Sequence, residues 1–174
     1  DAAKIRTWDD YYRAAKKLKE NGVYIAADDG DASFYNAMIW LAGGRPYNTS
    51  HDGKEVSITL DTDTGTQEFT RFWQQMSDED LVNTRLDTWS DDWKQALGSG
   101  TVASLFAGAW MPSLLLADVP GTAGLWRVAQ MPTAHGNLTN AENGGSALGV
   151  LSSSRRPEAS WRFIEYVCHE TAGI

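Results

Sequence analysis

The sequence predicts an α/β fold, in which helices cover the faces of a central sheet. Short apolar runs typical of strands alternate along the chain with longer segments of helical periodicity. This alternation is the pattern of sheets whose strands are connected by helices. The chain also contains no internal repeat, low-complexity run or convincing linker. We therefore expect the 174 residues to form a single domain.

The first predicted helix starts after Thr7, and Asp10 follows three residues later. This pair resembles a capping box, in which the two side chains accept backbone N–H groups at the helix start. Apolar residues then recur at helical spacing as far as Leu18, and the following Asn-Gly pair ends the helix. Residues 23–27 are apolar and are expected to form a short, mostly buried strand.

The next stretch combines an acidic turn, a helix and a loop. Residues 28–31 form the turn, and residues 32–42 form a helix that two glycines, Arg and Pro terminate. Residues 47–55 are polar and are expected to be mainly loop. Residues 56–60 alternate weakly in polarity, as a strand does.

The third predicted helix has Thr64 or Thr66 as its cap. Its large apolar residues fall at the i, i+3, i+4 and i+7 positions that share one face of a helix. This expected core face consists of Phe69, Phe72, Trp73 and Met76.

The second half of the chain continues the alternation. A helix over residues 90–97 precedes a buried strand over residues 102–106. The turn Gly108-Ala109-Trp110 leads into another helix, which continues to about residue 117. Further strands are expected over residues 126–130 and 147–151.

The last predicted helix covers residues 157–169. Its periodicity indicates a buried face, which we expect to contain Trp161, Ile164 and Val167 or Cys168. Cys168 is the only cysteine, so an intrachain disulfide and a disulfide-stapled scaffold are excluded. We expect Cys168 to be an inert core residue.

The charge balance excludes some classes of partner. The chain has 23 acidic and 15 basic residues, a net charge of -8. Nucleic acids and anionic membrane surfaces require clustered Lys and Arg, so neither is expected as a partner. No stretch approaches the roughly 18 apolar residues of a transmembrane helix.

The usual catalytic motifs are missing. There is no phosphate-binding loop and no dinucleotide fingerprint, and the glycine after Ser146 stands one residue too late for a nucleophile elbow. The three His residues form no metal-spaced pair, and the calcium-like run at residues 61–65 has Phe72 where a ligating Glu is required. The paired carboxylates lie at turns and helix starts, and none is singled out as a glycosidase pair. No enzyme activity, metal or cofactor is therefore expected.

Aromatic residues and small polar groups at turns remain as candidate binding residues. The chain has eight Trp, of which we expect about five to lie in the core and a few to line an aromatic site. Trp110 stands in a glycine-flanked turn between a strand and a helix, where it would stack on the face of a sugar ring. Asp31 precedes a helix, where its carboxylate would accept hydrogen bonds from hydroxyl groups. Each residue also has a purely structural interpretation, as packing at a hinge or as a helix cap.

Several motifs follow one another in a recognisable order. They are a Thr-Trp-Asp-Asp-Tyr helix start, a helix ending in Leu-Ala-Gly-Gly, and a small helix, Gly-Ser-Gly and strand that lead to Gly-Ala-Trp. A Val strand near Met-Pro, a glycine-rich crossing segment and a closing helix come after them, at residues 128–132, 143–150 and 157–164. In this order the chain resembles the extracellular solute-binding proteins of carbohydrate ABC importers, the group that includes maltose-binding protein. The resemblance runs from Thr7 to the end.

This resemblance implies a set of ligand-binding residues. Trp110 would stack on the sugar ring, and Asp31, Phe34 and Tyr35 would reach the same cleft from the start of the second helix. The segment Asn143, Gly144 and Gly145 would lie near the ligand, at the crossing between two lobes.

The resemblance also implies a fold and a role. The fold is one lobe of a class II periplasmic-binding-protein clamshell: mainly the second lobe, with a strand and helix at residues 147–174 that return toward a first lobe absent from this chain. The role is that of a monomeric receptor outside the cytoplasmic membrane, tethered as a lipoprotein, which delivers a mono- or oligosaccharide to a membrane permease. A receptor for a non-sugar solute, a carbohydrate-active enzyme and a purely structural module stay open as alternatives.

Overall fold

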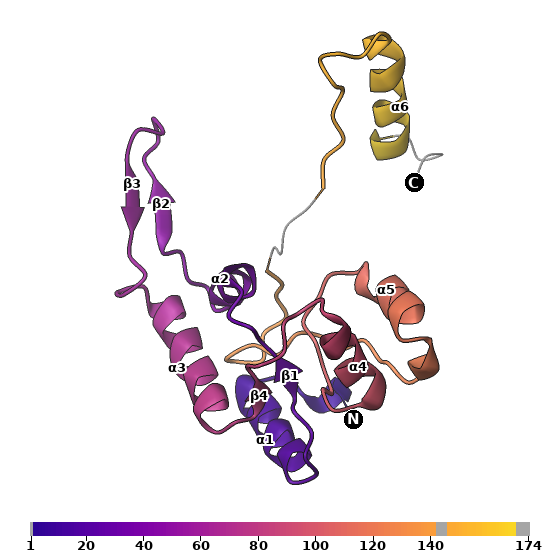
Figure 1. Ribbon diagram of the computed structural model, residues 1–174. Coiled ribbons are helices and arrows are strands. Elements are labelled where there is room, and N and C mark those ends of the chain that lie inside the picture. The colour runs from indigo at the N-terminus through magenta and orange to yellow at the C-terminus, as the bar shows by residue number, and fades with distance from the viewer. Residues whose placement is uncertain (1, 142–145, 170–174) are drawn as a thin grey trace. The chain divides into compact units, whose positions relative to one another are not determined.

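The computed structural model describes residues 2–141 and 146–169 (Figure 1). The chain divides into two compact units, residues 1–143 and residues 144–174.

Three parallel segments form the centre of the first unit. Strand β1 (Ala26–Ala27) pairs in parallel with β4 (Val82–Asn83). On the other side of β1, Tyr24 forms a parallel bridge with Val102, and the amide of Ser104 continues the pairing. The pairing of the predicted strands 23–27 and 102–106 is therefore confirmed, although regular strand structure is shorter than expected. Residues 102–106 are less buried than predicted, since Val102 is buried but Ala103 is exposed.

Five α-helices surround this centre. On one side of β1, α2 and α3 lie next to each other, and α4 and α5 lie on the other side (Figure 1). The helices are α1 (Trp8–Lys19), α2 (Ala32–Leu41), α3 (Thr64–Asp78), α4 (Asp91–Ser99) and α5 (Met111–Asp118), with short 3₁₀ helices at Ala2–Lys4 and Pro120–Thr122. All five were expected from the sequence, and the four with a predicted end finish within about two residues of it.

The helix caps confirm one prediction and correct another. At α1 the hydroxyl of Thr7 accepts the amide of Asp10 at 3.0 Å, and the Asp10 carboxylate accepts the amide of Thr7 at 3.0 Å, as a capping box requires. The cap of α3 is Asp63, where Thr64 or Thr66 was predicted. Its carboxylate accepts the amide of Thr66 at 2.8 Å and, through its other oxygen, the amide of Arg45 at 3.0 Å.

Residues 47–55, expected to be mainly loop, instead supply one strand of a hairpin. Strand β2 (Tyr47–Thr49) pairs antiparallel with β3 (Val56–Ile58), and Gly53 adopts a left-handed φ of 71° in the connection. All six strand residues are exposed. A strand without a buried face has no need for alternating polarity, which explains why the pattern did not reveal β2.

Two other strand predictions are wrong. Within the described residues, neither 126–130 nor 147–151 forms a strand. Val128 is 90% exposed and Leu151 is 76% exposed. These segments have the apolar composition of strands but no partner strand in the described structure, and a strand requires a partner for its backbone hydrogen bonds.

The main core lies between α1, α2 and α3. Phe69 and Met76 of α3 are fully buried, Trp73 is nearly so, and the half-buried Phe72 stacks on Trp8 at a centroid distance of 5.0 Å. The predicted face of α3 is thus confirmed. A smaller cluster between α4 and α5 contains Trp93, Leu97, Val102 and Met111.

Two glycines allow α2 and α3 to approach closely. A Cβ atom on Gly65, in the first turn of α3, would lie 2.3 Å from the backbone nitrogen of Gly44. A Cβ atom on Gly44 would lie 2.6 Å from the Asp63 carboxylate and 2.9 Å from the carbonyl of Ile39. No side chain fits at either position without movement of the backbone.

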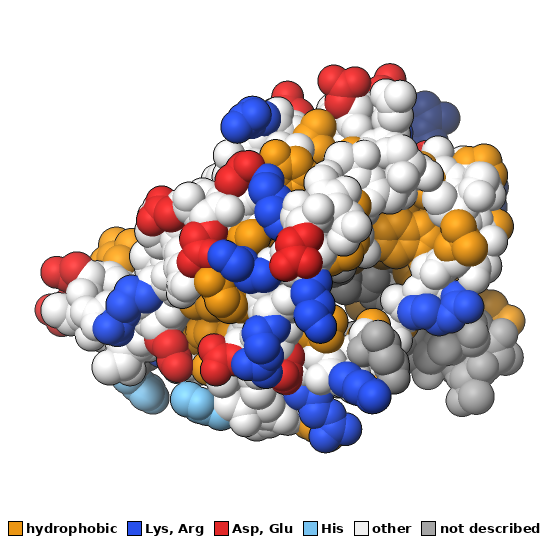
Figure 2. All heavy atoms as spheres, turned by 90° about the horizontal axis from the view of Figure 1, so that it is seen from below, with side chains coloured by type: hydrophobic (Ala, Val, Ile, Leu, Met, Phe, Trp, Pro, Cys, Tyr) orange, Lys and Arg blue, Asp and Glu red, His pale blue; other side chains and the backbone are white. Residues whose placement is uncertain are grey.

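Ion pairs join α1 to the end of α3. Lys16 contacts Glu79 at 2.9 Å, and Lys19 contacts Asp80 at 2.5 Å. Figure 2 shows basic and acidic side chains interspersed on the face seen from below. The hydroxyl of Tyr12 also donates to Glu79. Hydrogen bonding by Lys16, Gln75 and Tyr12 lowers the pKa of Glu79 to about 2.

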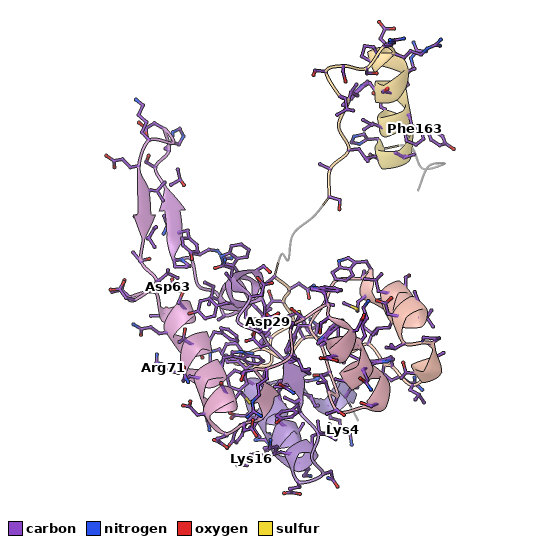
Figure 3. All side chains as sticks on the ribbon, viewed as in Figure 1. Lys4, Lys16, Asp29, Asp63, Arg71 and Phe163 are labelled. Carbon is purple, nitrogen blue, oxygen red and sulfur yellow. The ribbon has the colours of Figure 1, made fainter. Side chains whose placement is uncertain are left out.

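The second unit contains α6 (Pro157–His169), which confirms the predicted helix. Its predicted buried face is wrong: no residue of α6 is buried, Trp161 is 54% exposed, and Cys168 is exposed. Figure 3 shows Phe163 on this helix, where it is also exposed. The described part of this unit has no sheet or second helix to cover the apolar side of α6.

Candidate functional site

The carboxyl ends of the three parallel segments meet at one edge of the central sheet. The loops that leave this edge are residues 28–31 after β1, residues 84–90 after β4, and residues 105–110 after the Val102 segment. Ligands of open α/β sheets bind outside the carboxyl ends of the strands. This edge is therefore where a binding site is expected.

Trp110 lies at this edge, as predicted. It occupies the N-cap position of α5 and is 48% exposed. Its indole folds back over Gly108, where a Cβ atom would lie 2.7 Å from the indole nitrogen. The glycine thus leaves the space that the ring occupies.

Trp89 is a site residue that the sequence did not reveal. Its ring lies 5.7 Å from Trp110 and 5.2 Å from Trp93, measured between centroids, and it is 52% exposed. Its φ of 72° is a left-handed conformation that is rare for a large side chain. Its position in the sequence could have indicated this role. Trp89 directly precedes Ser90, the cap of α4, so it lies outside the helical periodicity that predicts core residues.

Asp29 ties two of the loops together. One carboxylate oxygen accepts the amide of Thr88 at 2.8 Å and the hydroxyl of Thr88 at 2.5 Å, and the other accepts the amide of Asp31 at 3.2 Å. The hydrogen bonds from Thr88 lower the pKa of Asp29. Figure 3 shows Asp29 at this edge, with Lys16 on the opposite side of the sheet.

Asp31 is the N-cap of α2 and is exposed. Its carboxylate accepts the amide of Ser33 at 2.9 Å and also the hydroxyl of Ser33, and these bonds lower its pKa. Asp28 accepts the indole N–H of Trp73 at 2.6 Å and the amide of Gly30 at 2.9 Å. These acids thus hold the local structure of the turn.

Phe34 and Tyr35 are half-buried. The Phe34 ring contacts Phe106 at 5.7 Å and Trp73 at 5.2 Å, so it joins α2 to the core beneath the site. The Tyr35 hydroxyl lies 2.5 Å from that of Thr70 on α3. The structure therefore brings Trp110 and Asp31 to one sheet edge and uses Phe34 and Tyr35 in packing. Asn143, Gly144 and Gly145 lie outside the described residues.

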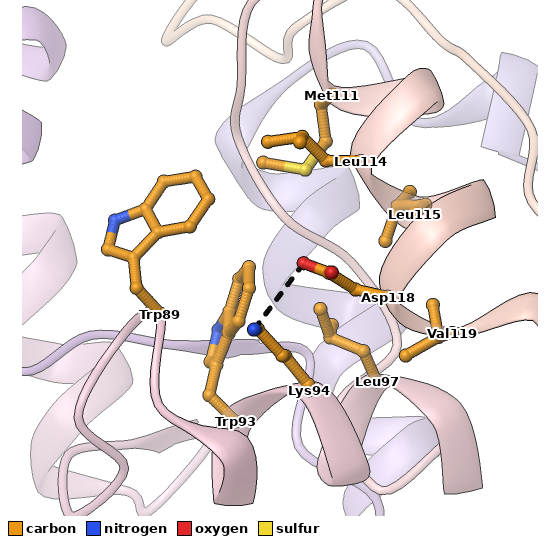
Figure 4. A pocket seen from close by; sticks show the side chains of 9 residues that line it. All are labelled: Trp89, Trp93, Lys94, Leu97, Met111, Leu114, Leu115, Asp118 and Val119. Carbon is orange, nitrogen blue, oxygen red and sulfur yellow. Dashed lines mark ion pairs between the residues drawn. The ribbon is translucent and has the colours of Figure 1, made fainter.

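A small apolar hollow lies between α4 and α5, beside Trp89 (Figure 4). An ion pair between Lys94 and Asp118, at 3.6 Å, lies at this hollow. The cavity volume is about 10 Å³, far below the roughly 300 Å³ at which ligand pockets begin. It is lined by Trp89, Trp93, Lys94, Leu97, Met111, Leu114, Leu115, Asp118 and Val119. The candidate site is thus the open aromatic face of Trp89 and Trp110, not this hollow.

Two features are absent from the described residues, 2–141 and 146–169. They contain no group of three or more His, Cys, Asp and Glu side chains arranged to hold a metal ion. None of their helices combines the length and the apolar character needed to cross a bilayer.

The sequence matches one family model over residues 1–170, described as bacterial extracellular solute-binding protein. No curated protein matches the chain.

Solved structures with the same fold are binding proteins of ABC transporters. The ABC transporter associated binding protein of B. animalis subsp. lactis Bl-04, in complex with β-1,6-galactobiose, is 51% identical with a TM-score of 0.89, over 99% of this chain and 43% of that one. The galacto-N-biose/lacto-N-biose I-binding protein of Bifidobacterium longum, with lacto-N-biose, is 26% identical with a TM-score of 0.75, over 94% and 41%. A solute-binding protein of Thermotoga lettingae bound with α-D-tagatose is 25% identical with a TM-score of 0.68, over 92% and 41%. The chain thus spans less than half the length of these proteins.

Proposed function

The chain belongs to the bacterial extracellular solute-binding protein family, and on this basis we propose that it is the second lobe of a longer sugar receptor serving an ABC importer. In this role the receptor captures a mono- or oligosaccharide between two lobes and passes it to a membrane permease. It binds and releases its ligand without making or breaking a covalent bond. We further propose that the receptor is monomeric and is held outside the cytoplasmic membrane by a lipid anchor.

One observation carries the proposal: two adjacent, half-exposed indoles lie at the carboxyl edge of the parallel segments. Flat apolar rings suit the C–H faces of sugars, and a large exposed aromatic pair on a soluble protein usually marks a binding surface. The B. animalis protein, whose structure contains β-1,6-galactobiose, supports a carbohydrate ligand for this chain as well.

The open shape of the site suits capture by closure. The described residues supply one aromatic side, and the first lobe of the clamshell would supply the other when the hinge closes. Closure removes the sugar from water and strengthens each hydrogen bond to it. Residues 143–145, predicted to lie at the crossing between the lobes, are proposed to lie near the ligand as well.

Calorimetry on the complete receptor tests the function. Sugars named with the similar structures, β-1,6-galactobiose, lacto-N-biose and tagatose, form the first panel. We expect at least one to bind, and we expect Trp110→Ala to weaken binding by about 1–3 kcal/mol, the scale of stacking on an aromatic platform. Trp126→Ala is the matched control, because Trp126 is half-buried and its indole N–H donates to Thr122 at 2.9 Å.

The outcomes separate the alternatives. Unchanged affinity in Trp110→Ala contradicts the stacking role. Stabilisation by an amine, peptide or metal chelate in a thermal-shift screen, with no effect of sugars, would indicate a different solute. Release of free sugar from a glycoside would indicate an enzyme. The chain by itself is expected to bind weakly, since one side of the site is absent.

A further inference from the structure

We propose that Asp29 is a positioning residue, which acts through Thr88 and Trp89 to orient Trp110 for ligand stacking. The inference rests on the proposed function where it concerns ligand. The orientation of the two rings is a property of the chain itself and is testable without ligand.

The backbone conformation of Trp89 indicates that its surroundings hold it in place. A φ of 72° places a bulky residue in the left-handed region, which a side chain with a Cβ atom rarely enters. Such a conformation persists only where the surrounding structure enforces it, and it is found most often at functional sites. The contacts on either side of Trp89 must therefore hold it in place.

Both neighbours of Trp89 are held. Before it, Thr88 gives its amide and its hydroxyl to the same oxygen of Asp29, at 2.8 and 2.5 Å, across 59 residues of chain. After it, the Ser90 hydroxyl donates to the carbonyl of Asp87 at 2.6 Å and accepts the amide of Trp93 at 3.2 Å. The Ser90 contacts are local to its own helix start. Among the hydrogen bonds of residues 88 and 90, those from Thr88 to Asp29 are the ones that join this loop to the loop after β1.

The two rings are also in contact. Trp89 lies 5.7 Å from Trp110 at an interplanar angle of 34°, and it rests on the buried Trp93 at 5.2 Å. Trp110 is half exposed, and its indole nitrogen lies over Gly108. Its orientation therefore depends on Trp89 on one side and on the space above Gly108 on the other. A shift of the Thr88 loop removes the first support.

Near-ultraviolet circular dichroism of the 174-residue chain tests the relay. Trp89→Phe and Trp110→Phe each identify the signal that arises from the coupled indoles. We expect Asp29→Ala to remove that signal while the far-ultraviolet spectrum is retained. The matched control is Asp87→Ala, which removes an exposed acid from the same loop and is expected to leave the signal unchanged.

Two further variants keep the test decisive if Asp29→Ala fails to fold. Thr88→Val keeps the volume of the side chain but removes the hydroxyl that Asp29 accepts, and it is expected to reduce the signal. Asp29→Asn retains an oxygen acceptor for Thr88, so it is expected to keep most of the indole signal that Asp29→Ala loses. A full indole signal in Asp29→Ala, or in Thr88→Val where the first does not fold, overturns the relay.

Affinity in the complete receptor provides the second readout. With whichever sugar binds the wild type, Asp29→Ala is expected to weaken binding about tenfold, since a disordered stacking ring must be ordered on binding. An unchanged affinity there contradicts the relay. If no sugar binds the wild-type receptor, the proposed function fails, and the spectroscopic result still decides the relay.

Discussion

Trp8 and Trp73 lie in one region of the first unit, and Trp89 and Trp110 lie in another. The first two are buried, and their indole N–H groups donate to the carbonyl of Pro132 at 3.1 Å and to Asp28 at 2.6 Å. The second two lie on loops at the sheet edge and are about half exposed. The same residue type thus serves two purposes, and the difference shows that placement, rather than abundance, identifies the site. In this unit Trp8 and Trp73 lie on helices and face the core, whereas Trp89 and Trp110 lie at the sheet edge and are half exposed.

The largest expected effect is in the buried pair. Trp73→Ala should lower the free energy of unfolding by about 3–5 kcal/mol, because it leaves a large cavity and removes the N–H partner of Asp28. Trp110→Ala should change stability by less than about 1 kcal/mol, since its ring is half exposed. Urea denaturation of the chain measures both. Similar losses of unfolding free energy in the two variants would contradict the difference between the two regions.

One methyl group added in each region sharpens the comparison. Gly65→Ala forces backbone apart, because its Cβ would lie 2.3 Å from the Gly44 nitrogen, and it should destabilise the chain by about 1–3 kcal/mol or more. In Gly108→Ala the Cβ meets the movable indole of Trp110, so stability should change little. Thermal unfolding tests the first expectation, and tryptophan fluorescence tests the displaced ring in the second. A Gly108→Ala variant that loses as much stability as Gly65→Ala contradicts this account.

The smallest effect belongs to the ion pair at the edge of the buried region. Because Lys16, Gln75 and Tyr12 bond the Glu79 carboxylate, its pKa falls from an ordinary 4.5 to about 2 in the folded chain. The folded state therefore binds fewer protons, and the contribution of Glu79 to stability is present above pH 4.5 and lost as the pH falls toward 2. Wild type should exceed Glu79→Gln slightly in denaturation midpoint at pH 7, and the gap should close near pH 2. A difference in denaturation midpoint that does not change with pH would contradict a stabilising role for the ionised Glu79.

Local signals predicted the helices well. The apolar spacing of α3 and the capping box of α1 depend on side chains within one or two helical turns, so both can be predicted from the sequence. The spacing of α6 is equally clear, yet no residue of α6 is buried. Periodicity indicates which side of a helix is apolar, whereas burial depends on whether something covers that side.

Distant contacts account for part of what the sequence did not reveal. The hairpin of β2 and β3 is exposed and lacks alternation. Asp63 was missed although its capping bond to Thr66 is local, because Thr64 and Thr66 stand next to it as equally suitable cap residues. Trp110 was predicted as a site residue because glycines mark its turn, and its role in binding stays a prediction. Trp89 was not, because its position depends on Asp29, from which Thr88 is 59 residues distant. The role of Asp31 in binding stays a prediction.

The order of the three parallel segments has a consequence for how ligand preference can change. Each loop at the sheet edge belongs to a different segment, so one loop can lengthen or change composition while the strands that carry it stay as they are. The loops joined by Asp29 and Thr88 are an exception, because an insertion in either one breaks their shared contact. We therefore expect directed evolution toward new ligands to accept insertions most readily in the loop before Trp110, and to accept changes in the other two loops mainly as matched pairs.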